Sequence, residues 1–363
     1  MSLTGSALRW VLVVATVGLP LFAVWAWGRA RGPRWLRAGQ RLGLVAAAQA
    51  VAVFLTFTLV NDSYDFYASW ADLFGQPVAA PAIVEGTGAK GPLLAADNGR
   101  LVQFTDYVGP ASGIRAPVLV HLPPQYDDPA YARTAFPVVE FLPGWRNSPR
   151  SWISQWQLFQ TTARLTRAGR MVPFIAVLPT MNVDLPRDTE CTDVPGSTQS
   201  FSWLAEDVPT LVHEHFRALM QPASWGAVGY STGGYCAAKL AYLRPQQFHV
   251  AAVLSGYFDA IKDSTTGDLW GGSSEVRHHN DLLWLARHGV HPGAYVLVYT
   301  SKQDPSSYVS SAAFLKAAKL PTRTFSIVTQ RGGHNLKGVI ASFPDVLVWL
   351  TQHVAGHHTA IGA

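Results

Sequence analysis

The chain has 363 residues, enough for one large domain or two modest ones. Its formal net charge of +5 comes from 28 basic and 23 acidic residues, but five of the arginines lie in the short segment 28–41. Without these five, 23 basic residues remain against 23 acidic ones. This balance argues against a nucleic-acid-binding surface.

Two uncharged apolar runs open the chain, Trp10–Trp27 and Leu42–Val60, with 18 and 19 residues. Each is about long enough to cross a bilayer as a helix. The segment between them contains Arg29, Arg31, Arg34, Arg37 and Arg41 and no acidic residue, and short arginine-rich loops stay on the cytoplasmic side of a membrane. We therefore expect residues 1–60 to be a two-span anchor in a bacterial-type cell membrane, with everything after Val60 outside the cytoplasm.

Two other interpretations of these runs stay open. The first run could be a cleaved signal peptide, although no convincing small-residue cleavage site follows it and a second run comes at once. Both runs could also be buried core helices, against which the arginine-rich loop argues. A transporter or receptor would need more spans or a charge within a span, and the sequence has neither.

Residues 61–95 are rich first in aromatics and then in Ala, Gly and Pro, a composition that predicts a connector. Its aromatic side chains follow the second run closely and fit a membrane interface: Tyr64, Phe66, Tyr67 and Trp70.

Residues 96–363 alternate between strand-like and helix-like segments. The expected strands are Arg100–Thr105, Pro117–Leu122, Phe136–Leu142, Val172–Leu178, Ala223–Tyr230, Val250–Ser255, Tyr295–Thr300 and Thr324–Val328. The expected helices are Ser151–Arg167, Phe201–Leu219, Thr232–Leu243, Ser307–Ala318 and Gly338–Val354. Near-continuous apolar strands separated by helices predict an α/β domain with a mostly parallel sheet covered on both faces.

Two polar, turn-rich stretches interrupt this pattern, Asn182–Ser200 and Asp259–Arg277. They either border a pocket or are ordinary surface loops. The two cysteines, Cys191 and Cys236, can form a disulfide outside the cytoplasm, but the sequence does not establish one. For Cys236, one turn into a predicted helix, we expect a buried free thiol. Neither cysteine has metal-ligand spacing with the histidines, and we expect no metal or organic cofactor.

The most informative motif is Gly229-Tyr230-Ser231-Thr232-Gly233, a G-x-S-x-G sequence continued by Gly234. It lies between a predicted strand and a predicted helix. A serine at such a sharp turn needs small neighbours, so that the backbone can bend and Oγ stands clear of the sheet. The motif predicts Ser231 as a nucleophile, with a chemically inert glycine turn as the alternative.

A serine hydroxyl is a weak nucleophile that needs a base, which in turn needs an orienting acid, and on this fold the chain order is Ser, Asp or Glu, His. His334, in a glycine-containing loop after the last predicted strand, is the predicted base; a helix-capping histidine is the plain alternative. Asp304, after the strand Tyr295–Thr300, is the predicted acid. Asp259, one strand earlier, is its rival, and a surface Asp-Pro cap is also open for Asp304.

The other histidines are weaker candidates. His213 and His215 are two residues apart on a predicted helix and face apart, which argues against joint metal binding. Five more lie in a polar loop or near the C-terminus, where solvent exposure is the default: His278, His279, His353, His357 and His358.

Acyl transfer also needs N–H donors aimed at the developing oxyanion. One predicted donor is the backbone N–H of Thr232, the residue after the nucleophile, and the second should come from the turn after the third strand. There Gly144 lets the backbone approach closely, which makes the N–H of Trp145 the candidate. Arg146 at the pocket rim, if it is not simply a solvated arginine, and Tyr230 are candidate substrate-binding residues.

Several of these segments together resemble the putative-esterase group of α/β-hydrolases, which includes esterase D-like enzymes and the secreted mycolyltransferases. The shared pattern covers roughly residues 101–354 and consists of Leu142–Arg146, Gln199–Leu204 with Asp207-Val208-Pro209, Gly229–Gly234, Pro245–Phe248 and Gly333-His334. The resemblance implies the α/β-hydrolase fold, with Ser231, Asp304 and His334 as a catalytic triad. It also implies Trp145 and Thr232 as the oxyanion hole.

The chain departs from the mycolyltransferases at three places. Those enzymes typically have Leu-Asp-Gly where this chain has Leu142-Pro143-Gly144, so a carboxylate for sugar hydroxyls is missing at Pro143. They usually have Glu as the triad acid, and an aromatic residue soon after the histidine, where this chain has Asn335-Leu336-Lys337. These differences argue against mycolyl transfer to trehalose, but not against serine acyl chemistry.

The sequence thus predicts a membrane-anchored, extracytoplasmic serine esterase that forms an acyl-enzyme and acts on an acyl ester, with a lipid or glycolipid as one candidate substrate. The first alternative is an acyltransferase that passes the acyl chain to a sugar or glycerol-type envelope acceptor. The second is an inactive hydrolase-fold binding module, which the retained order of serine, acid and histidine disfavours.

Overall fold

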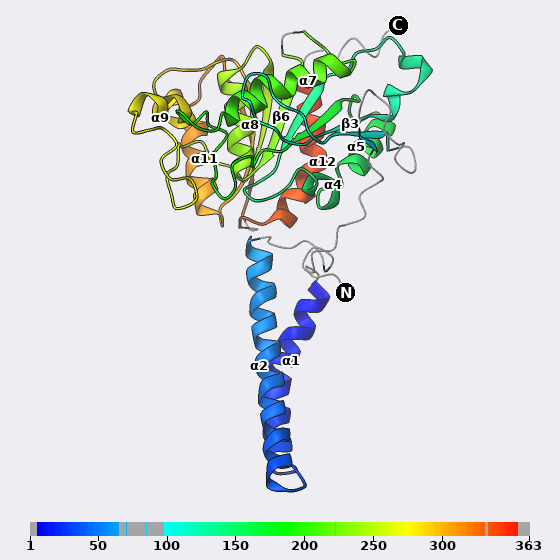
Figure 1. The fold of residues 1–363 in the computed structure, drawn as a ribbon, viewed down its shortest axis with the longest axis vertical. Coiled ribbons are helices and arrows are strands. Elements are labelled where there is room, and N and C mark those ends of the chain that lie inside the picture. The colour runs from blue at the N-terminus through cyan, green and yellow to red at the C-terminus, as the bar shows by residue number, and fades with distance from the viewer. Residues whose placement is uncertain are drawn as a thin grey trace. The chain divides into compact units, whose positions relative to one another are not determined.

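Two long helices, α1 (Ser6–Trp27) and α2 (Arg34–Tyr64), pack against each other in the N-terminal part of the chain (Figure 1). Within them Ala7–Trp27 and Arg34–Asn61 are long and apolar enough to cross a membrane. Most of their large apolar side chains are exposed, whereas a soluble core helix would bury them. The two helices are therefore compatible with the predicted spans and do not fit the core-helix alternative.

The computed structural model describes residues 6–64, 70, 84–85, 98–221, 223–330 and 333–354. The chain divides into two compact units, one within residues 1–79 and the other within 80–363. Most of the predicted connector 61–95, including Phe66 and Tyr67, lies outside the described residues, as do His357 and His358.

The second unit is built on a nine-stranded sheet in the order β1-β2-β3-β5-β4-β6-β7-β8-β9. The strands are β1 (Val84–Glu85), β2 (Arg100–Phe104), β3 (Val118–Leu122), β4 (Val138–Leu142), β5 (Ile175–Pro179), β6 (Trp225–Tyr230), β7 (Phe248–Leu254), β8 (Tyr295–Ser301) and β9 (Arg323–Thr329). The strands from β5 to β9 in this order are parallel, and β3 pairs antiparallel with both β2 and β5. The mostly parallel sheet predicted from the sequence is confirmed.

Buried side chains lie on both faces of the central strands, which explains why these strands are almost entirely apolar. Along β4, Val139 and Phe141 belong to one core cluster, and Val138 and Leu142 belong to the other. Such alternation is the period-2 geometry of a strand buried on both sides. The fold is therefore a three-layer α/β sandwich (Figure 1).

Each face of the sheet is covered by its own helices. One core cluster is shared with α7 (Val208–His215), α8 (Thr232–Leu243), α10 (Leu282–Arg287) and α11 (Pro305–Ala317). The other is shared with α4 (Ser151–Ser154), α5 (Leu158–Arg167) and α12 (Leu336–His353). In parallel strands the carboxyl ends meet at one edge of the sheet, and ligands of such folds bind there.

The structure corrects two predicted helices. The helix expected over Ser151–Arg167 is two helices, because Gln157 adopts a left-handed conformation with φ 48°. The helix expected over Phe201–Leu219 ends at His215, where Phe216 turns extended. It also begins as the short α6 (Ser200–Ser202) and the π-helical turn η3 (Trp203–Asp207), which precedes Pro209. Proline has no N–H to continue the regular helical ladder.

Further short elements escaped the sequence analysis. The stretch expected to be a polar insertion, Asp259–Arg277, ends inside α9 (Ser274–Asn280), and α10 follows it directly. Two single-turn 3-10 helices, η1 (Pro124–Tyr126) and η2 (Pro129–Tyr131), follow β3.

The expectation of a free thiol at Cys236 is wrong, because Cys191 and Cys236 form a disulfide. The stretch Asn182–Ser200 folds back over α8, and the two Cα atoms come within 5.9 Å. Sequence spacing gave no sign of this, since 45 residues separate the two cysteines. The bridge ties a polar loop to the helix that starts at Ser231.

Candidate active site

Ser231 lies in a sharp turn between β6 and α8. Its backbone has φ 56° and ψ −123°, a conformation that non-glycine residues rarely adopt and that clusters at functional sites. A Cβ at Gly229 would overlap the carbonyl of Gly233, and one at Gly233 would overlap the carbonyl of Leu142. The glycines of the motif are therefore required by the close backbone approach around Ser231, as the sequence predicts.

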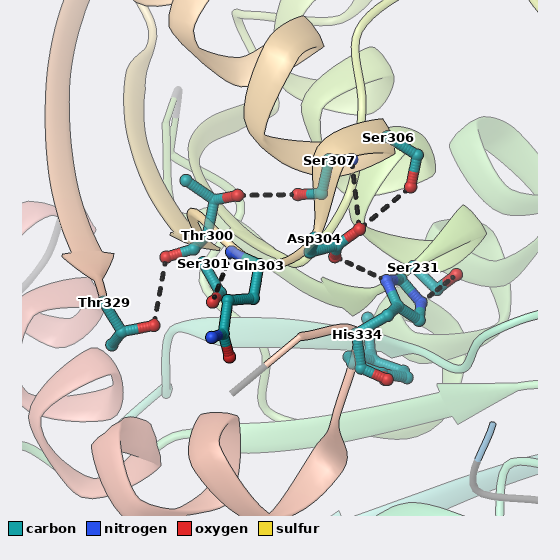
Figure 2. Close-up of polar contacts among 10 residues, drawn as sticks. Ser231, Thr300, Ser301, Gln303, Asp304, Ser306, Ser307, Thr329 and His334 are labelled. Carbon is teal, nitrogen blue, oxygen red and sulfur yellow. Dashed lines mark hydrogen bonds and ion pairs between the residues drawn. The ribbon is translucent and has the colours of Figure 1, made fainter. Parts of the chain in front are cut away.

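A chain of hydrogen bonds links Ser231, His334 and Asp304, which come from three separate strand ends (Figure 2). The distance between Ser231 Oγ and His334 Nε2 is 3.0 Å, and that between His334 Nδ1 and Asp304 Oδ2 is 2.7 Å. Asp304 follows β8, and His334 follows β9 just before α12. The structure thus brings together the three residues singled out as nucleophile, base and acid.

The surroundings of Asp304 keep its carboxylate ionised. Burial raises the pKa of Asp304, but the hydrogen bond and charge of His334, with hydrogen bonds from Ser306 and Ser307, outweigh this and leave the pKa below its ordinary value. An ionised carboxylate only accepts hydrogen bonds, so Nδ1 of His334 must carry the proton. Nε2 is then free to accept the hydroxyl proton of Ser231.

The rival acid and four of the other candidate histidines are engaged elsewhere. Asp259 accepts a hydrogen bond from the hydroxyl of Ser310, on α11. His215 contacts the carbonyl of Leu211 in its own helix. His278 stacks on Trp284, and ring contacts also engage His213 and His353.

The two candidate substrate-binding residues differ in exposure. Tyr230 is buried, and its ring packs 5.3 Å from the ring of His334 while its hydroxyl approaches the carbonyl of His334 at 3.5 Å. It therefore supports the histidine loop more than it faces solvent. Arg146 is exposed, and its guanidinium lies 5.7 Å from the ring centroid of Trp145.

The turn that carries the predicted donor Trp145 lies beside Ser231. A Cβ at Gly144 would stand 3.4 Å from Ser231 Cβ, which makes the approach of the two segments close. The turn is closed by a hydrogen bond from Asn147 N to Gly144 O. Asn182, from the segment after β5, donates from Nδ2 to the carbonyls of Gly144 at 3.2 Å and Asn147 at 2.9 Å.

The second predicted donor, the N–H of Thr232, begins α8, where backbone N–H groups have no partner within the helix. The side chain of Thr232 lies in a buried polar network that sequence reasoning missed. Its hydroxyl donates to Asp188 Oδ2 at 3.3 Å and lies 3.3 Å from the hydroxyl of Tyr257. Tyr257 in turn donates to Glu190 Oε1 at 2.5 Å.

Both carboxyl groups of this network are deeply buried. Burial raises the pKa of Asp188 to about 6, against hydrogen bonds from Glu190 N and Thr232 that lower it. Burial, followed by the charge of Asp188, raises the pKa of Glu190 well above its ordinary value. Lys239 of α8 is fully buried, and burial lowers its pKa to about 7. Two carboxyl groups and a lysine, all with pKa values shifted towards the uncharged form, therefore lie next to the site where negative charge would develop.

No group of three or more His, Cys, Asp or Glu side chains that could hold a metal ion occurs among the described residues. The site contains the elements of nucleophilic catalysis instead: a hydroxyl on a strained turn, a histidine in hydrogen-bond contact with it and a buried carboxylate behind the histidine.

The sandwich of parallel strands and the serine on its strand-to-helix turn define a serine hydrolase of the α/β-hydrolase class. The chain belongs to the putative esterase family, whose pattern residues 110–322 match. Carboxylic ester hydrolysis is thus its general activity.

One curated relative is an uncharacterized protein of Corynebacterium glutamicum, 24% identical over 338 residues, 87% of this chain and 77% of the relative. Among solved structures, an S-formylglutathione hydrolase of Agrobacterium tumefaciens is similar at a TM-score of 0.61 and 17% identity, over 73% of this chain and 99% of that one. A fluorophosphonate-binding serine hydrolase of Staphylococcus aureus is similar at a TM-score of 0.56 and 16% identity, over 70% of this chain and 98% of that one. A ferulic acid esterase of Anaeromyces mucronatus is similar at a TM-score of 0.53 and 18% identity, over 76% of this chain and 94% of that one. At these identities the structures share the fold.

Proposed function

We propose that this protein is a membrane-anchored, extracytoplasmic serine esterase in which Ser231, His334 and Asp304 form the catalytic triad. The observation that carries the proposal is the continuous chain of hydrogen bonds from Ser231 Oγ through both nitrogens of His334 to Asp304. The ionised Asp304 fixes the histidine tautomer that can accept a proton from the serine.

In the proposed reaction, Ser231 Oγ attacks the ester carbonyl carbon as its proton passes to His334 Nε2. The tetrahedral intermediate collapses when the histidine returns this proton to the leaving alkoxide, which departs as an alcohol and leaves an acyl-enzyme. Water then attacks the acyl carbon in the same way, its proton passing through His334, and the acid is released. Asp304 orients the imidazole and stabilises its positive charge in both halves.

We further propose that the backbone N–H groups of Trp145 and Thr232 form the oxyanion hole. Two features support this assignment: the Gly144 turn lies against Ser231, and Thr232 starts α8. The positive end of the helix dipole also favours negative charge at this point. Losing one such donor costs about 3–4 kcal/mol of transition-state stabilisation.

Hydrolysis is preferred to acyl transfer because the side chain of His334 is 37% exposed, so water can reach the general base. Transfer to a sugar or glycerol-type acceptor would use the same acyl-enzyme and stays the alternative. Product analysis with and without added glycerol or trehalose separates the two. Free acid as the main product under both conditions supports the esterase, and an acylated acceptor in excess of free acid contradicts it.

The proposed location rests on two independent features. The five arginines between α1 and α2 favour a cytoplasmic loop, which places the remainder of the chain on the other side of the membrane. The disulfide between Cys191 and Cys236 is typical of an oxidising compartment. Protease added to intact protoplasts should remove the esterase unit; full protection of that unit until lysis would contradict this topology.

The catalytic assignment is tested with a fluorophosphonate probe on the full chain. We expect the wild type to be labelled and Ser231→Ala to be unlabelled. Ser255→Ala is a matched control, since Ser255 also follows a central strand with a positive φ of 49° yet is buried. It should be labelled like the wild type. An unlabelled wild type would favour the inactive binding module, and a labelled Ser231→Ala would place the nucleophile elsewhere.

A further inference from the structure

We infer that the segment after β5, residues 180–192, braces both walls of the oxyanion hole, with Asn182 and Asp188 as positioning residues. The inference rests on the proposed function, because it takes the N–H groups of Trp145 and Thr232 as the oxyanion donors. It adds residues that contact neither the serine nor the substrate but set where the two donors lie.

The need for such a brace follows from where the donors come from. Trp145 lies in the turn after β4, and Thr232 is the first residue of α8 after β6. These are separate elements, and an error of about 1 Å in the placement of a catalytic group can cost on the order of 100-fold in rate. A third element that touches both would hold their relative position.

Asn182 fixes the first wall. Its Nδ2 donates to the carbonyls of Gly144 and Asn147, at 3.2 and 2.9 Å. These two carbonyls belong to the first and last residues of the turn that carries Trp145, which the hydrogen bond from Asn147 N to Gly144 O closes. One amide group thus holds both ends of the turn and with it the direction of the Trp145 N–H.

Asp188 fixes the second wall, six residues further along the same segment. Its Oδ2 accepts the hydroxyl of Thr232, and its Oδ1 accepts the N–H of Glu190 at 3.0 Å. The same carboxylate therefore ties the first residue of α8 to the backbone of the segment. Only 4% of Asp188 is exposed, so water cannot replace these hydrogen bonds easily.

The segment itself is held by α8. The disulfide joins Cys191 to Cys236, and one turn further along the helix Lys239 donates to the carbonyl of Cys191 at 2.8 Å and to Thr192 Oγ1 at 3.0 Å. Glu190 and Cys191 both have positive φ, 49° and 39°, and such strained backbone persists only where its surroundings fix it. Asp188 is thus anchored three residues before a covalent cross-link.

The test compares Asn182→Asp, Asn182→Ala and Asp188→Ala with the wild type in the full chain. Asn182→Asp keeps the size of the side chain but cannot donate. We expect each variant to lower kcat by about 10- to 100-fold with KM little changed. Their affinity for a boronic acid that forms a tetrahedral adduct on serine should fall by the same factor as kcat/KM. Rates are divided by the number of sites titrated with fluorophosphonate, so that unfolded protein does not count.

Asp193→Ala is the matched control, since Asp193 lies in the same stretch but accepts from Ser202 N and Oγ and contacts neither donor. It should keep kcat even if its melting temperature falls. The brace is overturned if the Asn182 and Asp188 variants lose only stability, or if Asp193→Ala loses kcat equally. These outcomes are distinct from failure of the proposed function, in which the wild type itself or Ser231→Ala gives the wrong labelling.

Discussion

The two sides of Ser231 are built differently. On the histidine side, His334 is 37% exposed and is positioned by one carboxylate at the end of the neighbouring strand β8. On the oxyanion side, where Trp145 and Thr232 form the proposed oxyanion hole, Asp188 and Glu190 are 4% and 3% exposed and lie in a network closed by a disulfide. A proton carrier has to admit substrate and water, whereas dipoles that stabilise charge work best when they are fixed beforehand. Openness on one side and rigidity on the other suit these two tasks.

The largest effect is expected on the histidine side, from Asp304→Asn. An asparagine amide can donate to Nδ1 and force the other tautomer, in which Nε2 carries a proton and cannot accept from Ser231. We expect kcat to fall by roughly 10⁴-fold, measured as hydrolysis of a p-nitrophenyl ester by the full chain.

Asp259→Asn is the paired variant, because Asp259 was the competing choice of acid and contacts Ser310 instead of the histidine. Its kcat should stay close to that of the wild type. A large loss in Asp259→Asn together with a small one in Asp304→Asn would reverse the assignment of the acid.

The histidine side could be predicted from the sequence because its logic is local. Glycines around Ser231, an Asp after one strand and a His after the next follow the chain order of the fold. In the parallel sheet those strand ends meet at one edge, so the order in the chain translates directly into proximity. The central strands were predictable for the same reason, since their apolar runs need no distant partner.

On the oxyanion side the two donors, Trp145 and Thr232, could be predicted from the sequence, but the buried network that supports them could not, because its contacts join residues far apart in the chain. The sequence of Asn182–Ser200 is compatible with a pocket border or with an ordinary surface loop, and nothing in it indicates that Asp188, Glu190 and Cys191 are buried, as the structure shows. Thr232 and Asp188 are separated by 44 residues, and Lys239 and Cys191 by 48. Polar residues are normally assigned to the surface, and only tertiary partners make their burial favourable.

A second prediction concerns the covalent support of the oxyanion side. Replacing both Cys191 and Cys236 with serine removes a cross-link that closes a loop of 45 residues. Without the bridge the unfolded chain gains conformational entropy, because the loop no longer has to stay closed. The free energy of unfolding should therefore fall by about 4 kcal/mol. Urea unfolding of the full chain measures it. An unchanged midpoint would mean that the bridge does not brace this segment.

The smallest expected effect is on the pH dependence of the free energy of unfolding. The sign of this dependence differs between Asp188, on the oxyanion side, and Asp304, on the histidine side. Burial raises the pKa of Asp188 to about 6 from its ordinary 3.8. Between these values the folded chain binds more protons than the unfolded chain, so stability falls as pH rises from about 4 to about 6. Asp304 acts in the opposite direction, because its pKa is lowered in the folded chain. The stability that it contributes is present above its ordinary pKa and is lost as the pH falls below that value.

Asp188→Asn cannot ionise, so the slope that Asp188 contributes should disappear. Relative to the wild type, the variant should gain about 2 kcal/mol of unfolding free energy between pH 4 and pH 7, which is most of the equivalent of the raised pKa. Urea unfolding of both proteins at each pH gives this difference directly. If the difference between the two proteins is constant with pH, Asp188 ionises as freely in the folded chain as in the unfolded one. The carboxyl group would then be hydrated, and the buried, rigid oxyanion side would lose its contrast with the open histidine side.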